Sequence, residues 1–440
     1  MTMRSTQAMI TRRGALGAAA ALVSPPPDAA AAVRRRAPSG FLWGTAISAY
    51  QSEGNNTNAD DWLLENLKPT LYKERSGDAC DSYHRFAEDV ALNAALGLNA
   101  YRFGIEWSRI EPSPGAFSNA ELDHYEKVLE TCHAHGQTPI VTYNHFTSPL
   151  WFSERGGWEQ PDAPDLFARY CETVTRRLGP LMGLATTFNE ANIQELVQVL
   201  GMFTPPSPVA AQMIAAARRA TGSERFATLV YSDPKISGPL LLDGHRRAYA
   251  AIKAARPSLP VGLSLTTQEI QAVGPGSIAP QMEARFYGGW IEAARSHADF
   301  VGVQTYMRLL FDEKGWVPWP KGAEMTQAGY EFYPQALAST IRWAHRTIGK
   351  PIYVTENGIA TGDDRRRIAF IDQALDGVRA CLDEGIPVHS YLYWSLLDNF
   401  EWTSGYDKHF GLVAVDRTTF KRTPKPSALH FGKRARSNLI

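Results

Sequence analysis

The chain lacks the features that would indicate a metal, a nucleotide or a charged polymer as its partner. Its 440 residues contain four cysteines, no two of them at a short metal-ligand spacing, and no His-Glu-x-x-His motif. Glycine loops of the Walker and dinucleotide types are also absent from the sequence. The 45 basic and 45 acidic residues give a net charge of +0, which gives no reason to expect nucleic acid or an anionic membrane. We therefore expect no metal and no other cofactor.

The scarcity of cysteine also bears on stability. A chain of this length does not need disulfide bonds to hold a core, so we expect free, buried thiols at Cys80, Cys132, Cys171 and Cys381. A disulfide remains open as an alternative because the N-terminus has the pattern of an export signal.

Long apolar runs are missing as well. The N-terminal run over residues 15–23 is too short to cross a bilayer, so no membrane anchor is expected. The pair Arg12-Arg13 precedes this run, and prolines and small residues follow it. We expect a twin-arginine (Tat) signal over residues 1–32, cleaved near residues 30–32, and hence a periplasmic or secreted protein with one domain over residues 33–440. The alternative is a disordered tail that contains arginine.

The remaining sequence alternates between short β-branched or aromatic runs and longer amphipathic runs. Strands are expected over residues 41–48, 100–107, 138–145, 184–190, 261–267, 300–306, 351–358 and 388–396. Helices are expected over residues 87–96, 120–135, 164–178, 244–255, 282–298, 334–348 and 366–384. Eight such strand–helix units predict an α/β fold, a single (β/α)8 TIM barrel. Residues 204–208 and 315–322 are expected to be loops.

Two glutamates close two of these expected strands, each with an asparagine beside it. They are Glu190, in Thr187-Phe188-Asn189-Glu190, and Glu356, in Thr355-Glu356-Asn357-Gly358. The carboxyl ends of barrel strands meet at one mouth, where active sites lie. Cleavage of a glycosidic bond needs two carboxyl groups facing each other across such a gap. Other residues expected to reach this mouth from their strand ends are Trp107, His145, Tyr306 and Trp394.

The 11 tryptophans and 17 tyrosines fit such a substrate. Aromatic faces stack on the apolar C–H faces of sugar rings, although most of these side chains are expected to be core.

With these motifs in place, the chain resembles glycoside hydrolase family 1, the β-glucosidase family, as a divergent bacterial member. The resemblance runs from about Phe41 to Ser427. The matching stretches are Phe41-Leu42-Trp43-Gly44-Thr45-Ala46, Gln51-Ser52-Glu53-Gly54, Tyr101-Arg102-Phe103-Gly104-Ile105-Glu106-Trp107-Ser108-Arg109-Ile110, Asn189-Glu190, Thr355-Glu356-Asn357-Gly358 and Trp394-Ser395-Leu396-Leu397-Asp398-Asn399-Phe400-Glu401-Trp402.

The resemblance implies roles for five residues around the reaction. Glu190 is implied to be the general acid/base, which needs a raised pKa, and Glu356 the nucleophile, which must stay ionised. Arg102 is implied to lower the pKa of Glu356, and Tyr306 to donate a hydrogen bond to it. Asn189 is implied to bind the sugar 2-OH. A structural ion pair is the alternative for Arg102, and a turn residue the alternative for Asn189.

The resemblance also implies a pocket for the sugar that is transferred, the glycone. Its residues are Gln51, His145, Trp394, Glu401, Trp402 and Phe410. Gln51 and Glu401 can each bridge two hydroxyls, and Trp394 offers a stacking face. A negative charge on Glu401 near O4 and O6 would repel a 6-phosphate, so a non-phosphorylated glycoside is expected. A satisfied core histidine is the alternative for His145.

Some positions depart from the family pattern. Ala191 stands where proline usually follows the acid, Gly104 replaces a usual serine, and Gln304-Thr305 changes the sequence before Tyr306. Lys408-His409 precedes Phe410 in place of a usual arginine. These changes affect the expected substrate preference rather than the expected chemistry.

We therefore expect a retaining exo-β-glycosidase that acts on a small-molecule β-glycoside. β-D-Glucosides are the expected main substrates, and β-galactosides or β-fucosides the expected side substrates. A transglycosylase using the same residues and a catalytically silent sugar-binding barrel are the alternatives. Candidates for contact with the leaving group are Met202, Phe203, Glu269 and Trp316. The oligomeric state stays open.

Overall fold

The computed structural model describes residues 36–200 and 207–440. The expected export signal over residues 1–32 lies outside this part, as do Met202, Phe203 and most of the expected loop over residues 204–208.

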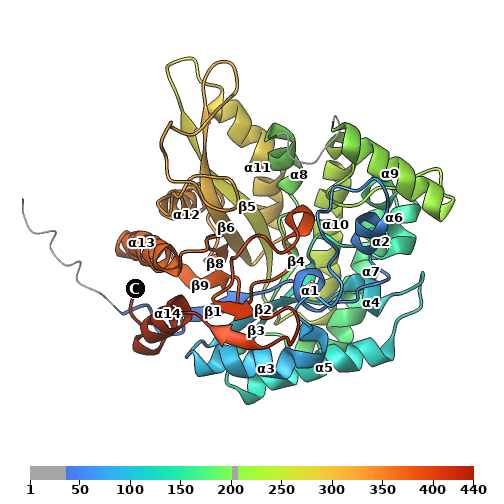
Figure 1. Cartoon of the computed structure of the whole chain (residues 1–440), viewed down its shortest axis with the longest axis horizontal. Coiled ribbons are helices and arrows are strands. Elements are labelled where there is room, and N and C mark those ends of the chain that lie inside the picture. The colour runs from blue at the N-terminus through green and yellow to red at the C-terminus, as the bar shows by residue number, and fades with distance from the viewer. Residues whose placement is uncertain (1–35, 201–206) are drawn as a thin grey trace, which may run out of the picture. The chain divides into compact units, whose positions relative to one another are not determined.

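Eight parallel strands close into a barrel in the order β5-β4-β3-β2-β1-β9-β8-β6, and β5 pairs with β6 to complete the ring (Figure 1). The strands are β1 Leu42–Ala46, β2 Ala100–Gly104, β3 Thr138–Asn144, β4 Leu184–Phe188, β5 Val261–Ala272, β6 Phe300–Phe311, β8 Ile352–Asn357 and β9 Val388–Trp394. Each corresponds to one of the eight expected strands, so the predicted TIM barrel is confirmed.

Helices surround the strands (Figure 1). The α-helices are α1 Ala49–Ser52, α2 Asp60–Asn66, α3 Ser82–Ala95, α4 Trp107–Ile110, α5 Asn119–Ala134, α6 Leu150–Glu154, α7 Ala163–Leu178, α8 Ile193–Val199, α9 Pro208–Thr221, α10 Pro234–Ala255, α11 Ala279–Ser296, α12 Ala336–Thr347, α13 Asp364–Asp383 and α14 Pro426–Ser437. Short 3₁₀ turns occupy Gly157–Glu159, Gly179–Leu181 and Trp402–Ser404.

The sequence explains these helices locally. Apolar residues of α7 recur at Phe167, Tyr170, Val174 and Leu178, a spacing that places all four on one buried face. At α5, the hydroxyl of Ser118 accepts a hydrogen bond from the Glu121 amide and so satisfies one of the free N–H groups of the first turn. Amphipathic spacing and capping therefore fix where these helices lie and begin.

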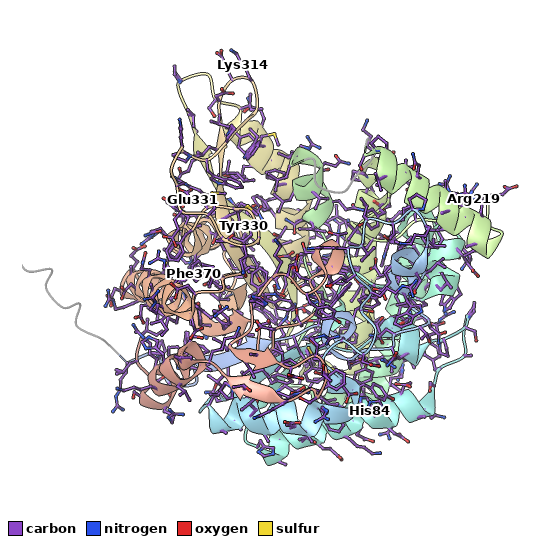
Figure 2. The ribbon with its side chains drawn as sticks, viewed as in Figure 1. His84, Arg219, Lys314, Tyr330, Glu331 and Phe370 are labelled. Atoms are coloured by element: carbon purple, nitrogen blue, oxygen red, sulfur yellow. The ribbon has the colours of Figure 1, made fainter. Side chains whose placement is uncertain are left out.

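Strands β5 and β6 run further than the sequence indicates. After a register shift between Thr267 and Glu269, their pairing continues to Ala272 and Phe311. The two-residue strand β7, Trp316–Val317, then pairs antiparallel with the end of β6, inside the segment that we expected to be a loop. A second small sheet joins β10, Val413–Val415, to β11, Arg422–Pro424. The rim of the barrel is therefore extended on the β5–β6 side, with Lys314 labelled in this projecting part (Figure 2).

The inside of the barrel changes character along its axis. Near the N-terminal ends of the strands, small and apolar side chains pack into one buried cluster that includes Ala100, Ile140, Leu184, Phe300 and Leu392. This packing closes that end of the barrel. Polar and charged side chains follow at the C-terminal ends, where they can reach a ligand.

Trp107 does not reach the mouth, so the prediction for this residue is wrong. Strand β2 ends at Gly104, and Trp107 begins the short helix α4. Its ring is 1% exposed and packs between Trp151, Phe152 and Tyr170. The chain turns away from the barrel axis before Trp107, which directs the indole into the helical layer.

All four cysteines are free and buried, as expected. In the described part of the chain, no helix is both long and apolar enough to cross a membrane.

Candidate active site

Glu356 lies near the end of β8 and is held by two donors from other strands. Its Oε1 accepts a hydrogen bond from Nη1 of Arg102 on β2 at 2.5 Å, and its Oε2 accepts one from the hydroxyl of Tyr306 on β6 at 2.7 Å. Arg102 is fully buried and the Glu356 residue is 4% exposed. Both carboxylate oxygens therefore have a fixed orientation at the mouth of the barrel.

Glu190 follows the end of β4 with a left-handed backbone, at φ 47°. This conformation costs a residue with a side chain about 1 kcal/mol or more, and such strain is concentrated at functional sites. The Glu190 amide donates to Ser264 O on β5 at 3.1 Å, which anchors the turn. Glu190 is 8% exposed, so its carboxyl group is almost dry.

The two carboxyl groups titrate differently. Burial raises the pKa of Glu190 well above its ordinary value, and the nearby charge of Glu356 raises it further. Burial also raises the pKa of Glu356, but Arg102 and Tyr306 oppose that rise. A proton entering this pair therefore resides on Glu190, while Glu356 keeps its charge.

Asn189 is oriented by two donors. Its Oδ1 accepts from Nη2 of Arg102 at 2.7 Å and from Nε2 of Gln304 at 2.8 Å. Because both bonds end on the carbonyl oxygen, the amide NH₂ group is left to face a ligand. Gln304, a departure from the family pattern, is thus part of the site rather than a neutral substitution.

Gln51 and Glu401 are joined to each other. The Gln51 carboxamide nitrogen donates to Phe400 O at 2.8 Å and to Glu401 Oε2 at 3.1 Å. The Gln51 oxygen accepts from Ser48. Both N–H groups of Gln51 are therefore used within the protein, and its oxygen keeps a lone pair for a ligand. Burial raises the pKa of Glu401 to about 8.

Three rings line the same side of the mouth. The imidazole of His145 lies nearly parallel to the rings of Trp394, at 5.6 Å, and Trp402, at 6.4 Å between ring centroids. Burial and the charge of Arg102 lower the pKa of His145 well below its usual range, so the ring is neutral. Its Nδ1 is buried and has no protein partner. Nε2 makes no hydrogen bond among the described residues either and is not fully buried, so this neutral ring can bond a hydroxyl through Nε2.

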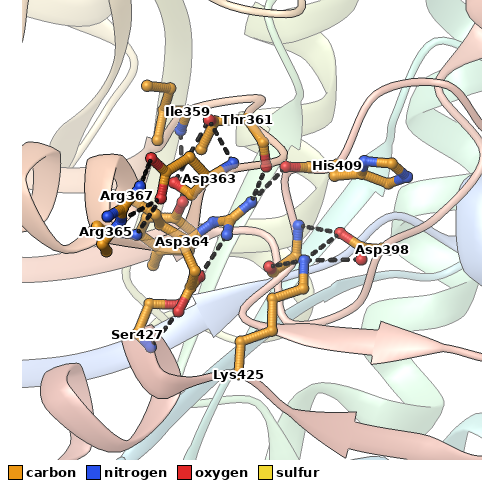
Figure 3. Close-up of polar contacts among 12 residues, drawn as sticks. Ile359, Thr361, Asp363, Asp364, Arg365, Arg367, Asp398, His409, Lys425 and Ser427 are labelled. Atoms are coloured by element: carbon orange, nitrogen blue, oxygen red, sulfur yellow. Dashed lines mark hydrogen bonds and ion pairs between the residues drawn. The ribbon is translucent and has the colours of Figure 1, made fainter.

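Phe410 packs in one buried cluster with Trp394 and stands edge-on to Tyr306 at 6.0 Å. A polar network holds the backbone on either side of it (Figure 3). Nη2 of Arg367 donates to His409 O and Thr361 O, and Nζ of Lys425 donates to Gly411 O. The residues before and after Phe410 are thus tied to α13 and to the start of α14.

Tyr330 is a residue that the sequence analysis missed. It lies in the connection between β7 and α12, where it neighbours Glu331 (Figure 2), and its ring is 6.4 Å from that of Tyr306. Its hydroxyl is buried without a protein partner, and Glu401 and Glu190 both raise its pKa after burial. A bidentate ion pair between Arg308 and Glu331 fixes this segment. No local motif around Tyr330 would have identified it.

Two candidates for leaving-group contact lie elsewhere. Glu269 is on the extended part of β5 and lines an outer groove together with Arg342 and Trp343 of α12. Trp316 lies on β7, 37% exposed, with its ring against Trp319. Neither lines the cavity beside Glu190, so their contact with the leaving group stays a prediction.

Comparison with known proteins agrees with this geometry. The sequence profile of "Glycosyl hydrolase family 1" matches residues 33–270 and 290–439. Beta-glucosidase A of Acetivibrio thermocellus is 27% identical, covering 91% of this chain and 98% of that relative. Beta-glucosidase of an Agrobacterium species is 30% identical, covering 89% and 94%. The solved structure of a beta-glucosidase termed 1317 is 47% identical with a TM-score of 0.87, covering 90% of this chain and 98% of its own. The chain belongs to glycosyl hydrolase family 1.

Proposed function

We propose that this protein is a retaining exo-β-glucosidase. The observation that supports it best is the pair of buried carboxyl groups with unequal proton affinity, Glu356 held by Arg102 and Tyr306, and Glu190 beside it. Such a pair supplies both an ionised nucleophile and a protonated acid. The names of the relatives, beta-glucosidase and beta-glycosidase, agree with a β-glucoside as substrate.

In the first step, Glu190 gives its proton to the glycosidic oxygen as that oxygen leaves the anomeric carbon. A carboxylate oxygen of Glu356 forms a bond to the same carbon from the opposite face, which yields a covalent glycosyl-enzyme. The NH₂ group of Asn189, set by Arg102 and Gln304, donates to the sugar 2-OH. That contact strengthens in the transition state.

In the second step, the ionised Glu190 takes a proton from water while the water oxygen attacks the anomeric carbon. The bond to Glu356 breaks, and its charge returns beside Arg102 and Tyr306. Two inversions give net retention of the β configuration. The silent sugar-binding alternative is not favoured, because both carboxyl groups and their donors are present together.

A non-phosphorylated sugar is the proposed glycone. Burial raises the pKa of Glu401 to about 8, so its negative charge is incomplete at pH 7 and repulsion of a phosphate is only part of the reason. A dianionic 6-phosphate beside it would still have to be buried and paired with a cation, and the nearby Lys408 already donates to Gln327 O. Comparing nitrophenyl β-glucoside with its 6-phosphate should show turnover of the first alone.

The assignment of the two glutamates can be tested by replacing each one. Glu356→Ala should abolish hydrolysis of aryl β-glucosides, and azide should restore product as the α-glycosyl azide. Glu190→Ala should turn over only substrates with good leaving groups, and azide should then give the β-anomer. Near wild-type turnover by Glu356→Ala would contradict the proposal.

We also propose export through the twin-arginine pathway, on the basis of the pair Arg12-Arg13. Changing both arginines to lysine should retain the enzyme in the cytoplasm of the producing cell. Unchanged activity in the periplasm or medium would contradict the proposal.

A further inference from the structure

A cavity of about 220 Å³ lies beside Glu190. Aliphatic side chains of α8 and of neighbouring segments form much of its wall, and they are Ile193, Leu196, Val197, Leu200, Val230 and Met307. Glu401 and Trp402 of the glycone pocket line this cavity as well. Because Glu190 protonates the oxygen that joins the glycone to the leaving group, we assign the part of the cavity formed by α8 to the leaving group. The leaving group therefore meets a mostly apolar surface.

One corner of this cavity is polar. Asp61 of α2 lines it together with Tyr72 and Tyr231, and these three residues are 4%, 7% and 6% exposed. The Tyr72 hydroxyl donates to Oδ1 of Asp61. Among the described residues, this is the one hydrogen bond that the Asp61 carboxyl group accepts. The other carboxyl oxygen, Oδ2, accepts none from these residues. Oδ2 is not fully buried, so it opens onto the cavity, where a ligand that displaces water has to supply a hydrogen-bond donor in its place.

The preceding residue, Asp60, differs from Asp61 because its carboxyl group has several hydrogen-bond donors. The Asp60 carboxylate is fully engaged, since it accepts hydrogen bonds from Ser148 N at 3.0 Å, Ser153 Oγ at 2.6 Å and Asp61 N at 2.9 Å. Asp60 therefore ties α2 to the segment after β3. Asp61 makes no such connection and faces the cavity instead.

We propose that Asp61 is a specificity-determining residue that accepts a hydrogen bond from a hydroxyl group of the leaving group. The preferred substrates of the enzyme would then be β-glucosides whose leaving group is an apolar ring that carries a hydroxyl. The inference rests on the proposed function, because it uses Glu190 to identify the leaving-group side. A ring fits the aliphatic wall of α8, and a hydroxyl fits the one corner that lacks a donor. Burial raises the pKa of Asp61 to about 7 and the bond from Tyr72 opposes that rise, so Asp61 is an ionised acceptor above pH 7.

The test compares leaving groups that differ only in the donor. The substrates are phenyl β-glucosides with a hydroxyl or a methoxy group at ring position 2, 3 or 4, so that the acidity of the leaving phenol is similar within each pair. The quantity measured is kcat/KM, which reports the step in which the leaving group departs. Above pH 7, the wild-type enzyme should prefer the hydroxyl member of at least one pair by about tenfold or more, the effect of a hydrogen bond to a charged group.

Asp61→Asn should reduce this preference to about twofold or less. Because Tyr72 donates to the oxygen at the Oδ1 position, the asparagine should turn its NH₂ group, a donor, toward the cavity. Glu65→Gln is the matched control. Glu65 is a buried carboxylate of the same helix, but it accepts from Ser76 and does not line the cavity. Its charge raises the pKa of Asp61, so its removal favours the ionised acceptor and the preference should persist or increase. Thermal melts of both variants establish that they fold.

Three results would overturn the inference. They are a wild-type enzyme without preference in any pair, an Asp61→Asn enzyme that keeps the preference, and a stronger Asp61-dependent preference for an aminomethyl ring, which would mean recognition of a cation. Failure of the proposed function looks different, because no β-glucoside, hydroxylated or methoxylated, would then be hydrolysed by the wild-type enzyme.

Discussion

Gln304 offers a direct test of how the site positions Asn189. Its Nε2 donates to Asn189 Oδ1, while its own Oε1 is buried without a protein partner. Gln304→Met keeps the length of the side chain and removes the donor. Loss of one neutral hydrogen bond of about 0.5–1.5 kcal/mol should lower kcat/KM for an aryl β-glucoside by about 2- to 12-fold. The bond from Arg102 remains, so the loss should stay below that of Asn189→Ala.

The assay that isolates this role uses the matching 2-deoxyglucoside. If Gln304 acts by presenting the Asn189 NH₂ group to the 2-OH, Gln304→Met should have little effect on a substrate without that hydroxyl. Thr305→Val is the control on the same strand, because Thr305 bonds Thr267 and Thr340 rather than Asn189. It should leave the ratio between the two substrates unchanged.

The same substitution predicts a gain in stability. Removing the Gln304 oxygen removes a buried acceptor that lacks a partner, a defect worth about 1–3 kcal/mol. Gln304→Met should therefore melt at the same temperature as the wild type or higher, while its activity falls. An equal loss of activity on the glucoside and the 2-deoxyglucoside would refute the reasoning.

Three further predictions concern single side chains. Glu190→Gln should lower kcat/KM by about 10²- to 10⁴-fold for substrates with poor leaving groups, far less for dinitrophenyl glucosides, and should abolish the basic limb of the pH profile. Tyr306→Phe removes a donor that lowers the pKa of Glu356, so this pKa should rise and the acidic limb of kcat/KM should move to higher pH; an unmoved limb would contradict this role. Arg422→Met breaks a buried ion pair with Asp89 and should lower the free energy of unfolding by about 3–5 kcal/mol, measured by denaturant titration. Because the unpaired Asp89 would then be buried with a raised pKa, the loss should shrink as the pH falls.

The sequence predicted the barrel because strand and helix periods alternate eight times, and each period is a local property. It could not predict where a strand ends, because pairing with a neighbouring strand in the folded chain determines that end. The ladder between Glu269 and Arg308 extends both partners well past the rim, although neither segment alone marks that extension. Trp107 shows the opposite case, since an apparent strand end turned into the start of a helix.

The candidate site was predictable where a motif carried it. Glu190 and Glu356 each stand in a short, specific motif at the end of a strand, and the two motifs together indicate a pair of catalytic carboxyl groups. Tyr330, Gln304 and Asp61 stand in no such motif. Their importance comes from a missing or redirected hydrogen bond, which is a relation between atoms that only the folded chain brings together.

The different roles of the two glutamates depend on the groups around each carboxyl group and not on burial alone. Both are buried at the same rim, so burial alone would raise both pKa values. Glu356 differs because Arg102 and Tyr306 reach it from β2 and β6, strands far away in the sequence. Glu190 stands beyond the end of its strand on a left-handed backbone, where Thr266 and the charge of Arg102 oppose the rise but do not overcome it. Closure of the barrel, which brings β2 and β6 to opposite sides of β8, is therefore what makes one carboxyl group the nucleophile and leaves the other to carry the proton.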